Sequence, residues 1–442
     1  MLSVAYLANQ FPVAVEPYVT EEIDELRRLG IRVITGTVTR TREGKIRGSP
    51  DVVLRPVEGL VLARAVWMCV WRWNRIADLI ARVLFQGQEG PIPRVKALLH
   101  TLLGACYAVR LEEHGVEHIH AHHGFSASWI AMAAARLLDL NFSMTLHGSD
   151  LLLHRAYLDV KLRNCALCLT VSEYNRRFIA THYPEIELAK VVVARLGVEI
   201  PETGIPKLIA LRNRVGPFRI LAIGRLHAVK DHAFLVRACS HLQAQRLDFH
   251  CEIAGEGPER RRLESLIREL KLERRVTLLG HIPPEQTDSL YRRADLLVLT
   301  SRSEGIPLVL MEAMARGKLV VAPAITGIPE LVIAGKTGFL YQPGSMREFL
   351  EQLTEISWLL GKAPLLAHET HEKRGINDVP SRPNTNDSTK RLDWVRHAAR
   401  VQICHNFNRE KNLQSFTDVF LRRVFPPPGK ELPHASSVLQ QI

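Results

Sequence analysis

Few cysteines, no long apolar run and no secretory leader exclude several classes of protein for this chain. The 442 residues contain seven cysteines, too few and too scattered for the disulfide framework of a small secreted protein. Cys165-x2-Cys168 lies in an apolar, strand-like run, where buried thiols are favoured over metal or redox use. No stretch reaches the ~18 uncharged apolar residues of a membrane-spanning helix, and the first residues enter a predicted strand without a signal-peptide pattern. We therefore expect a cytoplasmic protein.

The sequence also lacks the patterns of most metal and nucleic-acid sites. It contains no Asp-x-Asp for a metal-bridged diphosphate, no zinc-binding spacing and no RNA-binding strand signature. His118, His120 and His122 alternate on one face of a predicted strand and His123 follows them, but no carboxylate partner accompanies them. We therefore expect no metal, no cofactor and no nucleic-acid partner.

Composition and charge indicate a large core and an anionic partner. The chain is 46% hydrophobic and 24% charged, with a formal net charge of +12, which suits two or three globular domains. This excess of positive charge is consistent with nucleic acid, phosphorylated substrates or an anionic membrane surface. Because no nucleic-acid recognition module is found, we favour phosphorylated substrates and a membrane surface.

Strands and helices alternate in both halves of the chain, which is typical of two doubly wound α/β domains. The predicted strands are 4–8, 31–35, 118–121, 142–146, 166–171 and 190–194 in the first half, and 219–223, 250–254, 275–279, 296–299 and 319–322 in the second. The predicted organisation is a first domain (1–200), a linker (201–217), a second domain (218–361), a disordered insertion (362–391), terminal helices (392–425) and a tail (426–442).

Two glutamates, Glu304 and Glu312, bracket the start of a predicted helix that follows the buried strand 294–300. The turn between strand and helix contains Gly305, Ile306 and Pro307. Proline is tolerated at the first helical position, and Gly317 is placed to end the helix. At the carboxyl end of a parallel strand, free N–H groups face an anion, and a carboxylate suits a hydroxyl group. The pattern therefore predicts a ligand with both phosphate and polyol, such as a nucleotide sugar.

A second strand-to-helix turn, from Gly224 to Asp231, carries two cations. The predicted strand 219–223 precedes this turn, and Asp231 is placed to cap the helix that follows it. Arg225 and Lys230 lie in between. A guanidinium fork together with a lysine point charge suits a diphosphate leaving group.

Together, Gly-Arg-Leu-x4-Lys-Asp and Glu-x7-Glu resemble the donor site of retaining glycosyltransferases of family 4, which have the GT-B fold. Further motifs are similar to the exopolysaccharide, colanic-acid-type branch of that family. They lie at 11–12, 16–19, 118–122, 145–150, 171–175, 255–258 and 335–340. The resemblance implies two doubly wound, Rossmann-like domains facing each other across a cleft, with a terminal helix, 413–424, crossing back to the first domain.

The resemblance also implies how the donor is bound. Glu304 would face the donor sugar and Glu312 would hold the ribose hydroxyls. Arg225 and Lys230 would offset the charge of the departing diphosphate. No metal would be needed, because these cations and the helix N-terminus neutralise the leaving group.

Sugar and acceptor contacts are assigned to loops at other strand ends. By resemblance, His147 would contact a hydroxyl of the donor sugar and orient it. Beside it, Ser149 and Asp150 either bind the acceptor or cap a helix. Glu16 follows the first strand and is expected in an acceptor-facing loop. Gly255 either forms a tight turn or lets the backbone approach the nucleotide.

Two apolar helical segments, 59–85 and 95–111, suggest contact with a membrane. In the first, Trp67, Trp71 and Trp73 are interspersed with Arg64, Arg72, Arg75 and Arg82. This pattern matches an interfacial amphipathic element, although packing in the core is the alternative. Because the acceptors of the resembled family are often lipid-linked, we expect peripheral association with the inner face of the cytoplasmic membrane.

The sequence thus predicts a retaining hexosyltransferase. It would move a hexosyl unit from a UDP- or GDP-sugar to a glycan or lipid-linked acceptor in cell-surface polysaccharide biosynthesis. One rival is a nucleotide-sugar epimerase of the same fold, which would need acid/base residues at other loop ends. Another is a catalytically silent scaffold on an anionic surface, which would not need the intact set of cations and glutamates.

Overall fold

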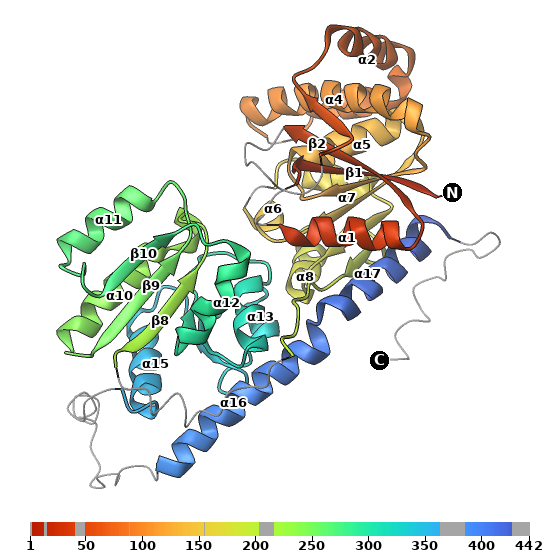
Figure 1. The fold of residues 1–442 in the computed structure, drawn as a ribbon. Coiled ribbons are helices and arrows are strands. Elements are labelled where there is room, and N and C mark those ends of the chain that lie inside the picture. Colours follow the sequence, from red (N-terminus) through yellow and green to blue (C-terminus); the bar gives the residue numbers. More distant parts are fainter. Residues whose placement is uncertain are drawn as a thin grey trace. The chain divides into compact units, whose positions relative to one another are not determined.

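The computed structural model describes residues 2–12, 16–39, 49–87, 89–153, 155–202, 216–362 and 385–426. The chain forms two compact units, Met1–Leu196 with Lys411–Ile442, and Gly197–Glu410. Each unit is built on a parallel β-sheet with helices on both faces (Figure 1). Most of the predicted linker, insertion and tail, at 203–215, 363–384 and 427–442, lies outside the described residues.

The first unit is built on a seven-stranded sheet whose strand pairs are all parallel. The strands are β1 (Ser3–Gln10), β2 (Arg32–Thr39), β3 (Val52–Arg55), β4 (His118–His122), β5 (Asn141–Leu146), β6 (Leu167–Thr170) and β7 (Val191–Val193). Their order is β3-β2-β1-β4-β5-β6-β7, so the direction of progression reverses between β1 and β4. Ligands of open α/β sheets bind beyond the carboxyl ends of the strands at such a switch point.

Helices cover both faces of this sheet. They are α1 (Pro17–Arg28), α2 (Gly59–Trp71), α3 (Ala77–Phe85), α4 (Pro91–Leu111), α5 (Ser126–Leu138), α6 (Ser149–Leu152), α7 (Leu158–Asn164), α8 (Glu173–His182) and α17 (Arg409–Val424), with 3-10 turns η1 (Trp73–Arg75), η2 (Glu112–His114) and η3 (Leu188–Lys190). Because side chains alternate along a strand, Val4 and Tyr6 of β1 pack with α1 and α17, whereas Ala5 and Leu7 pack with α4 and α5.

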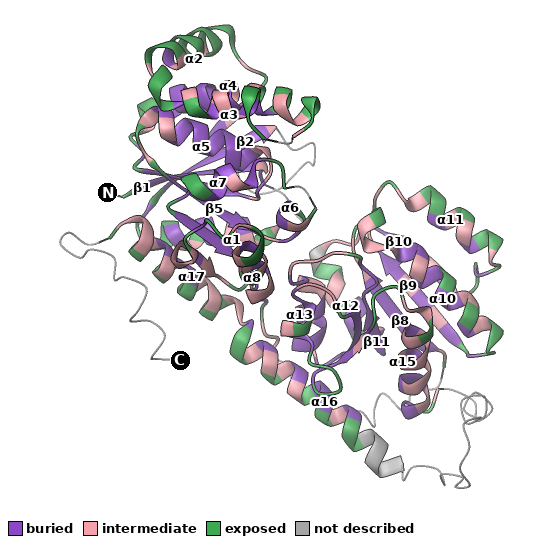
Figure 2. Ribbon diagram, turned by 180° about the vertical axis from the view of Figure 1, so that it is seen from behind, coloured by how far each residue is buried: buried purple, intermediate pink, exposed green. Residues whose placement is uncertain are grey.

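Helices α4 and α5 approach closely because Gly104 of α4 has no side chain. A Cβ atom at Gly104 would lie 2.7 Å from the Cβ atom of Ala133 in α5, well inside contact distance. Helix α2 packs on α4, and most of its residues are exposed (Figure 2). The apolar residues of α2 are therefore divided between a narrow contact with α4 and open solvent.

The composition of the segment 59–85 suggests one continuous helix, but the structure shows an interrupted one. It consists of α2, the turn η1 and α3, and the interruption begins at Arg72. Arg72 donates to the backbone carbonyl of Leu137, and Arg75 pairs with Asp139 at 2.5 Å. Both arginines therefore bind the end of α5, and these tertiary bonds hold a turn where helix propensity favours continuation.

The second unit is built on a six-stranded parallel sheet with the same kind of reversal. Its strands are β8 (Phe218–Ile223), β9 (Phe249–Ala254), β10 (Val276–Gly280), β11 (Leu296–Val298), β12 (Leu319–Pro323) and β13 (Phe339–Tyr341). Their order is β10-β9-β8-β11-β12-β13, which places the switch point between β8 and β11.

Helices also lie on both faces of the second sheet. They are α10 (His232–Ala244), α11 (Arg260–Glu269), α12 (Pro284–Arg293), α13 (Leu308–Ala315), α14 (Ile328–Leu331), α15 (Met346–Leu359) and α16 (Thr385–Asn406), with the 3-10 turn η4 (Ala228–Lys230). Helices α10, α11 and α15 cover one face, and α12 and α13 cover the other (Figure 1).

The two terminal helices belong to different units. Helix α16 packs against α13 and α15 in the second unit. It begins at Thr385, so the predicted disorder is wrong for 385–391, where the chain already forms a helix. Helix α17 joins the core of the first unit through Phe416 and Phe420. The predicted return of the terminal helix to the first domain is therefore confirmed.

Candidate active site

Two loops of the second unit meet at its switch point. One follows β8 and carries Lys230, and the other follows β11 and carries Glu304. The hydroxyl of Thr300 donates to the carbonyl of Lys230 at 3.0 Å, and the N–H of Arg302 donates to the carbonyl of Val229 at 2.8 Å. These bonds to the backbone fix the two loops against each other.

Lys230 and Glu304 form an ion pair, although 74 residues separate them. The Lys230 Nζ lies 2.5 Å from the Glu304 Oε1, and the side chains are only 18% and 11% exposed. Arg225, on the same loop as Lys230, is exposed, and its guanidinium makes no hydrogen bond or ion pair with any described residue. Both cations therefore lie on the predicted loop, and the guanidinium is free for an anionic ligand.

The turn before α13 leaves backbone donors unused. Within the described part of the chain, the N–H groups of Gly305 and Ile306 donate no hydrogen bond. Pro307 occupies the N-cap of α13, one position earlier than predicted, and Gly317 has φ +63° just after the helix, as predicted. Two unused donors beside a helix N-terminus are suited to an anion.

Glu312, on α13, is held by a buried tyrosine. The hydroxyl of Tyr291 on α12 donates to its Oε2 at 2.6 Å. Burial raises the pKa of the Glu312 carboxyl, and the hydrogen bond from Tyr291 and the charge of Arg316 oppose that rise. The bond to Tyr291 engages one carboxylate oxygen, and the other is a possible acceptor for a ligand hydroxyl.

The glycines after β9 are explained by a close approach of two loops. Gly255 has φ +147°, and a Cβ atom there would lie 2.0 Å from the carbonyl oxygen of Gly224. Gly257 has φ +158°, and its Cβ atom would lie 2.4 Å from the carbonyl oxygen of Leu226. Both glycines thus let this loop pack on the backbone next to Arg225. Contact of Gly255 with a nucleotide stays a prediction.

The sequence predicts that the Asp231 side chain caps α10, but this prediction is wrong. It stands at the N-cap with φ +46°, but makes no side-chain cap bond. Its carboxylate instead accepts a hydrogen bond from Arg302 Nε at 2.8 Å. The Asp231 carboxylate thus binds the guanidinium of Arg302 on the neighbouring loop instead of the helix N-terminus.

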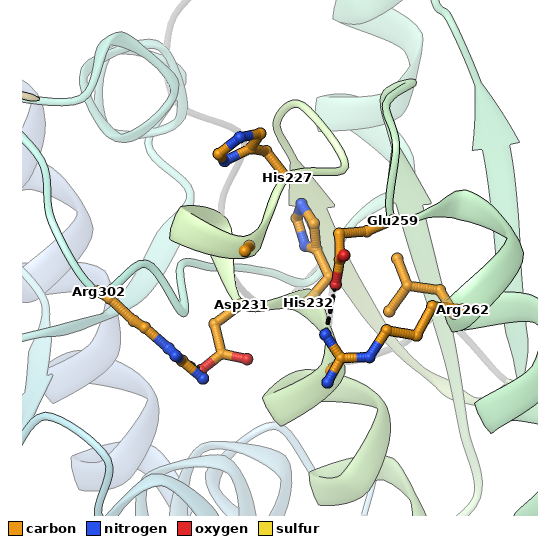
Figure 3. A pocket seen from close by; sticks show the side chains of 9 residues that line it. His227, Asp231, His232, Glu259, Arg262 and Arg302 are labelled. Atoms are coloured by element: carbon orange, nitrogen blue, oxygen red, sulfur yellow. Dashed lines mark hydrogen bonds and ion pairs between the residues drawn. The ribbon is translucent and has the colours of Figure 1, made fainter. Parts of the chain in front are cut away.

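A small cavity lies beside the ion pair of Asp231 with Arg302 (Figure 3). It measures about 100 Å³ and is lined in part by His227, His232 and the ion pair between Glu259 and Arg262. Burial lowers the pKa of the His232 imidazole. None of the predicted donor-binding residues lines this cavity, so it is not the predicted donor site.

In the first unit, a buried carboxylate shapes the loop that follows β5. Four backbone N–H groups donate to Asp150 at 2.8 to 3.1 Å, those of Gly124, His147, Gly148 and Leu151. Asp150 is fully buried, whereas its neighbour Ser149 is exposed. Of the two roles left open for Asp150, this geometry favours holding the local backbone over binding an acceptor.

His123 is a charged histidine at the end of β4. Its Nε2 lies 3.2 Å from Glu16 Oε2, and its Nδ1 lies 3.7 Å from Asp150 Oδ2. Burial lowers the pKa of His123, but the carboxylates of Asp150 and Glu16 outweigh burial and raise the pKa to about 10. Glu16 therefore lies beside a cation, and its contact with an acceptor stays a prediction.

His147 has the opposite electrostatic environment. Its ring centroid lies 4.6 Å from the ring of His123 and 4.6 Å from the ring of Tyr18. Burial, followed by the positive charge of His123, lowers the pKa of His147 well below its usual range. Two adjacent histidines thus carry different charges, the imidazolium of His123 and the neutral imidazole of His147.

The strand histidines have a carboxylate partner that the sequence did not indicate. Glu22 of α1 lies 3.0 Å from His122 Nε2, and the expectation of no such partner is wrong. Glu22, His120 and His122 offer three ligand atoms within 4.8 Å of one another. However, the two nitrogens of His120 already bond Ser143 and Thr145. We interpret the group as a buried hydrogen-bond network.

Sequence reasoning missed three residues of these clusters, Glu22, Tyr18 and Tyr291. Glu22 and Tyr18 lie on α1, and they reach His122 of β4 and His147 after β5, respectively, across 100 or more residues. Tyr291 reaches Glu312 from the preceding helix. Glu22 and Tyr291 stand in no short motif, and Tyr18 lies in the motif 16–19 without an assigned role, so only the tertiary fold reveals their partners.

Two units built on parallel sheets, each with a switch point, define a doubly wound α/β class of folds, and comparison with known proteins narrows that class. The model "Glycosyltransferase Family 4" matches residues 15–201, and "Glycosyl transferases group 1" matches residues 209–359. The chain therefore belongs to glycosyltransferase family 4.

Individual relatives agree with this assignment. The putative colanic acid biosynthesis glycosyltransferase WcaL of Escherichia coli K12 is 35% identical over 176 residues, which are 38% of this chain and 43% of WcaL. The chain thus spans less than half the length of this relative. Sucrose-phosphate synthase from Thermosynechococcus elongatus has a TM-score of 0.67 at 18% identity, covering 96% of this chain and 99% of that one.

A third structure, Anabaena HepE in complex with UDP-glucose, has a TM-score of 0.61 at 18% identity and covers 95% of this chain and 99% of its own. At such identities the structural likeness is evidence for the fold alone. The predicted GT-B fold is confirmed by these neighbours and by the two parallel sheets.

Proposed function

We propose that this protein is a retaining glycosyltransferase of exopolysaccharide biosynthesis. It transfers a hexosyl unit from a UDP- or GDP-sugar to a glycan or lipid-linked acceptor. The observation that carries the proposal is the ion pair of Lys230 with Glu304 at the switch point. One cation and one carboxylate at a strand end suit a ligand that joins a diphosphate to a polyol.

The cationic loop would serve the leaving group. Arg225 and Lys230, with the free N–H groups of Gly305 and Ile306, offset the negative charge that grows on the diphosphate as it departs. In the free protein, Lys230 is neutralised by Glu304. A bound diphosphate draws Lys230 toward itself and leaves Glu304 as an acceptor for sugar hydroxyls.

The reaction proceeds by attack on the same face of the sugar. The bond from the anomeric carbon to the diphosphate oxygen breaks, and the acceptor oxygen bonds to that carbon from the side that the diphosphate leaves. The acceptor's proton passes to the departing diphosphate oxygen. His147 orients the sugar through one of its hydroxyls, and no protein nucleophile takes part.

A screen of nucleotide sugars with the full chain tests the proposal. We expect a UDP- or GDP-sugar to bind, and the matching nucleoside diphosphate to appear when an acceptor is supplied. NMR of the product gives the anomeric configuration, and an inverted product would contradict the retaining mechanism. An epimerase would convert the sugar without releasing diphosphate, and a scaffold would bind no nucleotide sugar.

We further propose peripheral membrane binding through α2, η1 and α3. Among the described residues, no helix is long and apolar enough to cross a membrane. Yet Trp67 is 64% exposed, Trp71 is 73% exposed and Phe85 is 80% exposed. The rings of Trp67 and Trp71 stack at 5.6 Å. Aromatic rings presented in this way suit the interface between headgroups and acyl chains.

The arginines of this segment contribute less charge attraction than the sequence suggests. Three of them pair with acidic residues, Arg64 with Glu112, Arg75 with Asp139 and Arg82 with Glu89. Ring insertion therefore carries most of the proposed binding.

Flotation with liposomes tests the membrane proposal. We expect the wild type to float, and the double variant Trp67→Ser with Trp71→Ser to float much less. Trp394→Ser is the matched control, because Trp394 is 54% exposed on a helix of the other unit. Wild-type protein that stays at the bottom of the gradient would contradict membrane binding and favour a soluble acceptor.

A further inference from the structure

In the first unit, a chain of hydrogen-bonding atoms runs from the buried Glu22 through the buried His122 to His147. Glu22 Oε2 lies 3.0 Å from His122 Nε2, and His122 Nδ1 lies 3.3 Å from His147 Nε2. Glu22 is 5% exposed and His122 is fully buried. The remaining ring nitrogen, His147 Nδ1, is buried and has no hydrogen-bond partner among the described residues.

The carboxylate at one end and a neutral His122 together set the direction of every bond in this chain. An ionised Glu22 only accepts, so His122 must carry a proton on Nε2. A neutral His122 then presents a lone pair at Nδ1, and His147 must donate to it from Nε2. A neutral His147 has one ring proton, so its Nδ1 is left as a bare acceptor.

The ring and backbone of His147 are also held in place. The ring lies against those of Tyr18 and His123, and its backbone N–H donates to Asp150 at 3.1 Å. Its carbonyl accepts from the side-chain amide of Asn175 at 3.2 Å. The orientation of Nδ1 is therefore fixed before any ligand binds, which is the arrangement that gives a site selectivity.

We propose that Glu22 and His122 are positioning residues that keep the His147 proton on Nε2, so that Nδ1 accepts a hydrogen bond from a hydroxyl of the donor sugar. This inference rests on the proposed function, because it deepens the role given to His147. A lone pair at Nδ1 accepts a hydrogen bond from a hydroxyl, and a group without a proton would leave this nitrogen unpaired, which weakens binding. The site therefore selects a neutral hexosyl unit over one with a carboxylate or fluorine at the contacted position.

The first test is spectroscopic and needs no substrate. Long-range ¹⁵N–¹H correlation spectra of histidine-labelled full-length protein report which ring nitrogen carries the proton, and His147→Gln identifies the signals of His147. We expect the Nε2–H form in the wild type. A proton on Nδ1 would overturn the proposal, whatever the variants do.

The second test removes the carboxylate. In Glu22→Gln the amide either accepts from or donates to His122, so we expect the His147 signals to shift toward a mixture of both tautomers. His118→Gln is the matched control, since His118 is equally buried on β4 but bonds Ser143 and lies outside the chain of three. Unchanged His147 signals in a folded Glu22→Gln protein would overturn the role of Glu22.

Kinetics then connect the tautomer to the reaction. We expect Glu22→Gln to lower turnover at least ~10-fold, by analogy with other groups that fix a histidine tautomer. We also expect the turnover of wild type and variant to differ less with a donor that carries fluorine in place of the contacted hydroxyl than with the natural donor. A tautomer shift without loss of turnover would overturn the contact of His147 with the donor. A wild type that turns over no nucleotide sugar at all would instead overturn the proposed function.

Discussion

The clusters at the two switch points differ in how they hold their charges. In the second unit, Lys230 and Glu304 neutralise each other across two loops, and Arg225 is exposed. In the first unit, a charged His123 lies beside a neutral His147 among buried carboxylates. The first arrangement suits exchange of a charged ligand, whereas the second fixes hydrogen-bond directions.

This difference has a physical reason. In the absence of a phosphate, water solvates the exposed guanidinium of Arg225, and Glu304 neutralises Lys230. A neutral ligand such as a sugar offers only hydroxyl groups, so its site must supply donors and acceptors that are already oriented. The two clusters therefore respond to different perturbations, and the following tests separate them.

Loss of the loop cation should have the largest effect. We expect Lys230→Ala to lower turnover at least ~100-fold, because it removes one donor to the developing charge of the leaving group. Steady-state release of nucleoside diphosphate measures it. Arg262→Ala is the control, since Arg262 is a paired cation beside the same loops but outside the predicted site. Wild-type-like turnover of a folded Lys230→Ala protein would remove Lys230 from the site.

The charged histidine should contribute to stability within a defined pH window. The pKa of His123 is about 10 in the folded protein and ordinarily near 6.5, so protonation favours the folded state. This contribution is fully present below about pH 6.5 and disappears as the pH rises through 10. We expect His123→Gln to lower the free energy of unfolding by about 2 kcal/mol at pH 7 and by much less at pH 10.

Denaturant unfolding of both proteins at the two pH values gives the comparison. Burial lowers the pKa of Lys161 to about 8, so Lys161 titrates in the same window. Because both proteins contain Lys161, the difference between their free energies of unfolding at each pH isolates the contribution of His123. His182→Gln, at an exposed histidine, is the control. An equal loss of stability at both pH values would show that His123 acts through packing.

How far the sequence predicted these clusters follows from where their contacts come from. The loops that carry Lys230 and Glu304 could be predicted because each motif joins a strand to its own helix, and the switch point brings the two loops together. The parallel sheets also followed from alternating elements, except for the short edge strands β3 and β13. The partnership of Glu22 with His122 could not be predicted, because it joins α1 to β4 across 100 residues without a local pattern.

A milder test concerns the carboxylate predicted to hold the ribose. Tyr291→Phe removes the hydrogen bond to Glu312 and leaves the ring in place. Because that bond opposes the effect of burial, we expect the Glu312 pKa to rise further and the KM for the donor to increase about fivefold, which is about 1 kcal/mol. Tyr341→Phe is the control, since its hydroxyl bonds the Leu299 carbonyl. An unchanged KM would separate Glu312 from donor binding.

The smallest expected effect is that of a chelator. Two cations on one loop and two free N–H groups on the other would supply the neutralisation that a bridging metal gives in other enzymes. His120 and His122 already use both of their ring nitrogens in hydrogen bonds. We therefore expect EDTA to leave turnover within about twofold of its starting value. Adding zinc, magnesium or manganese back to the chelator-treated enzyme tests the two switch-point clusters separately. Loss of activity reversed by magnesium or manganese would place a metal at the diphosphate, whereas reversal by zinc alone would direct attention to Glu22, His120 and His122, the three residues that could hold such an ion.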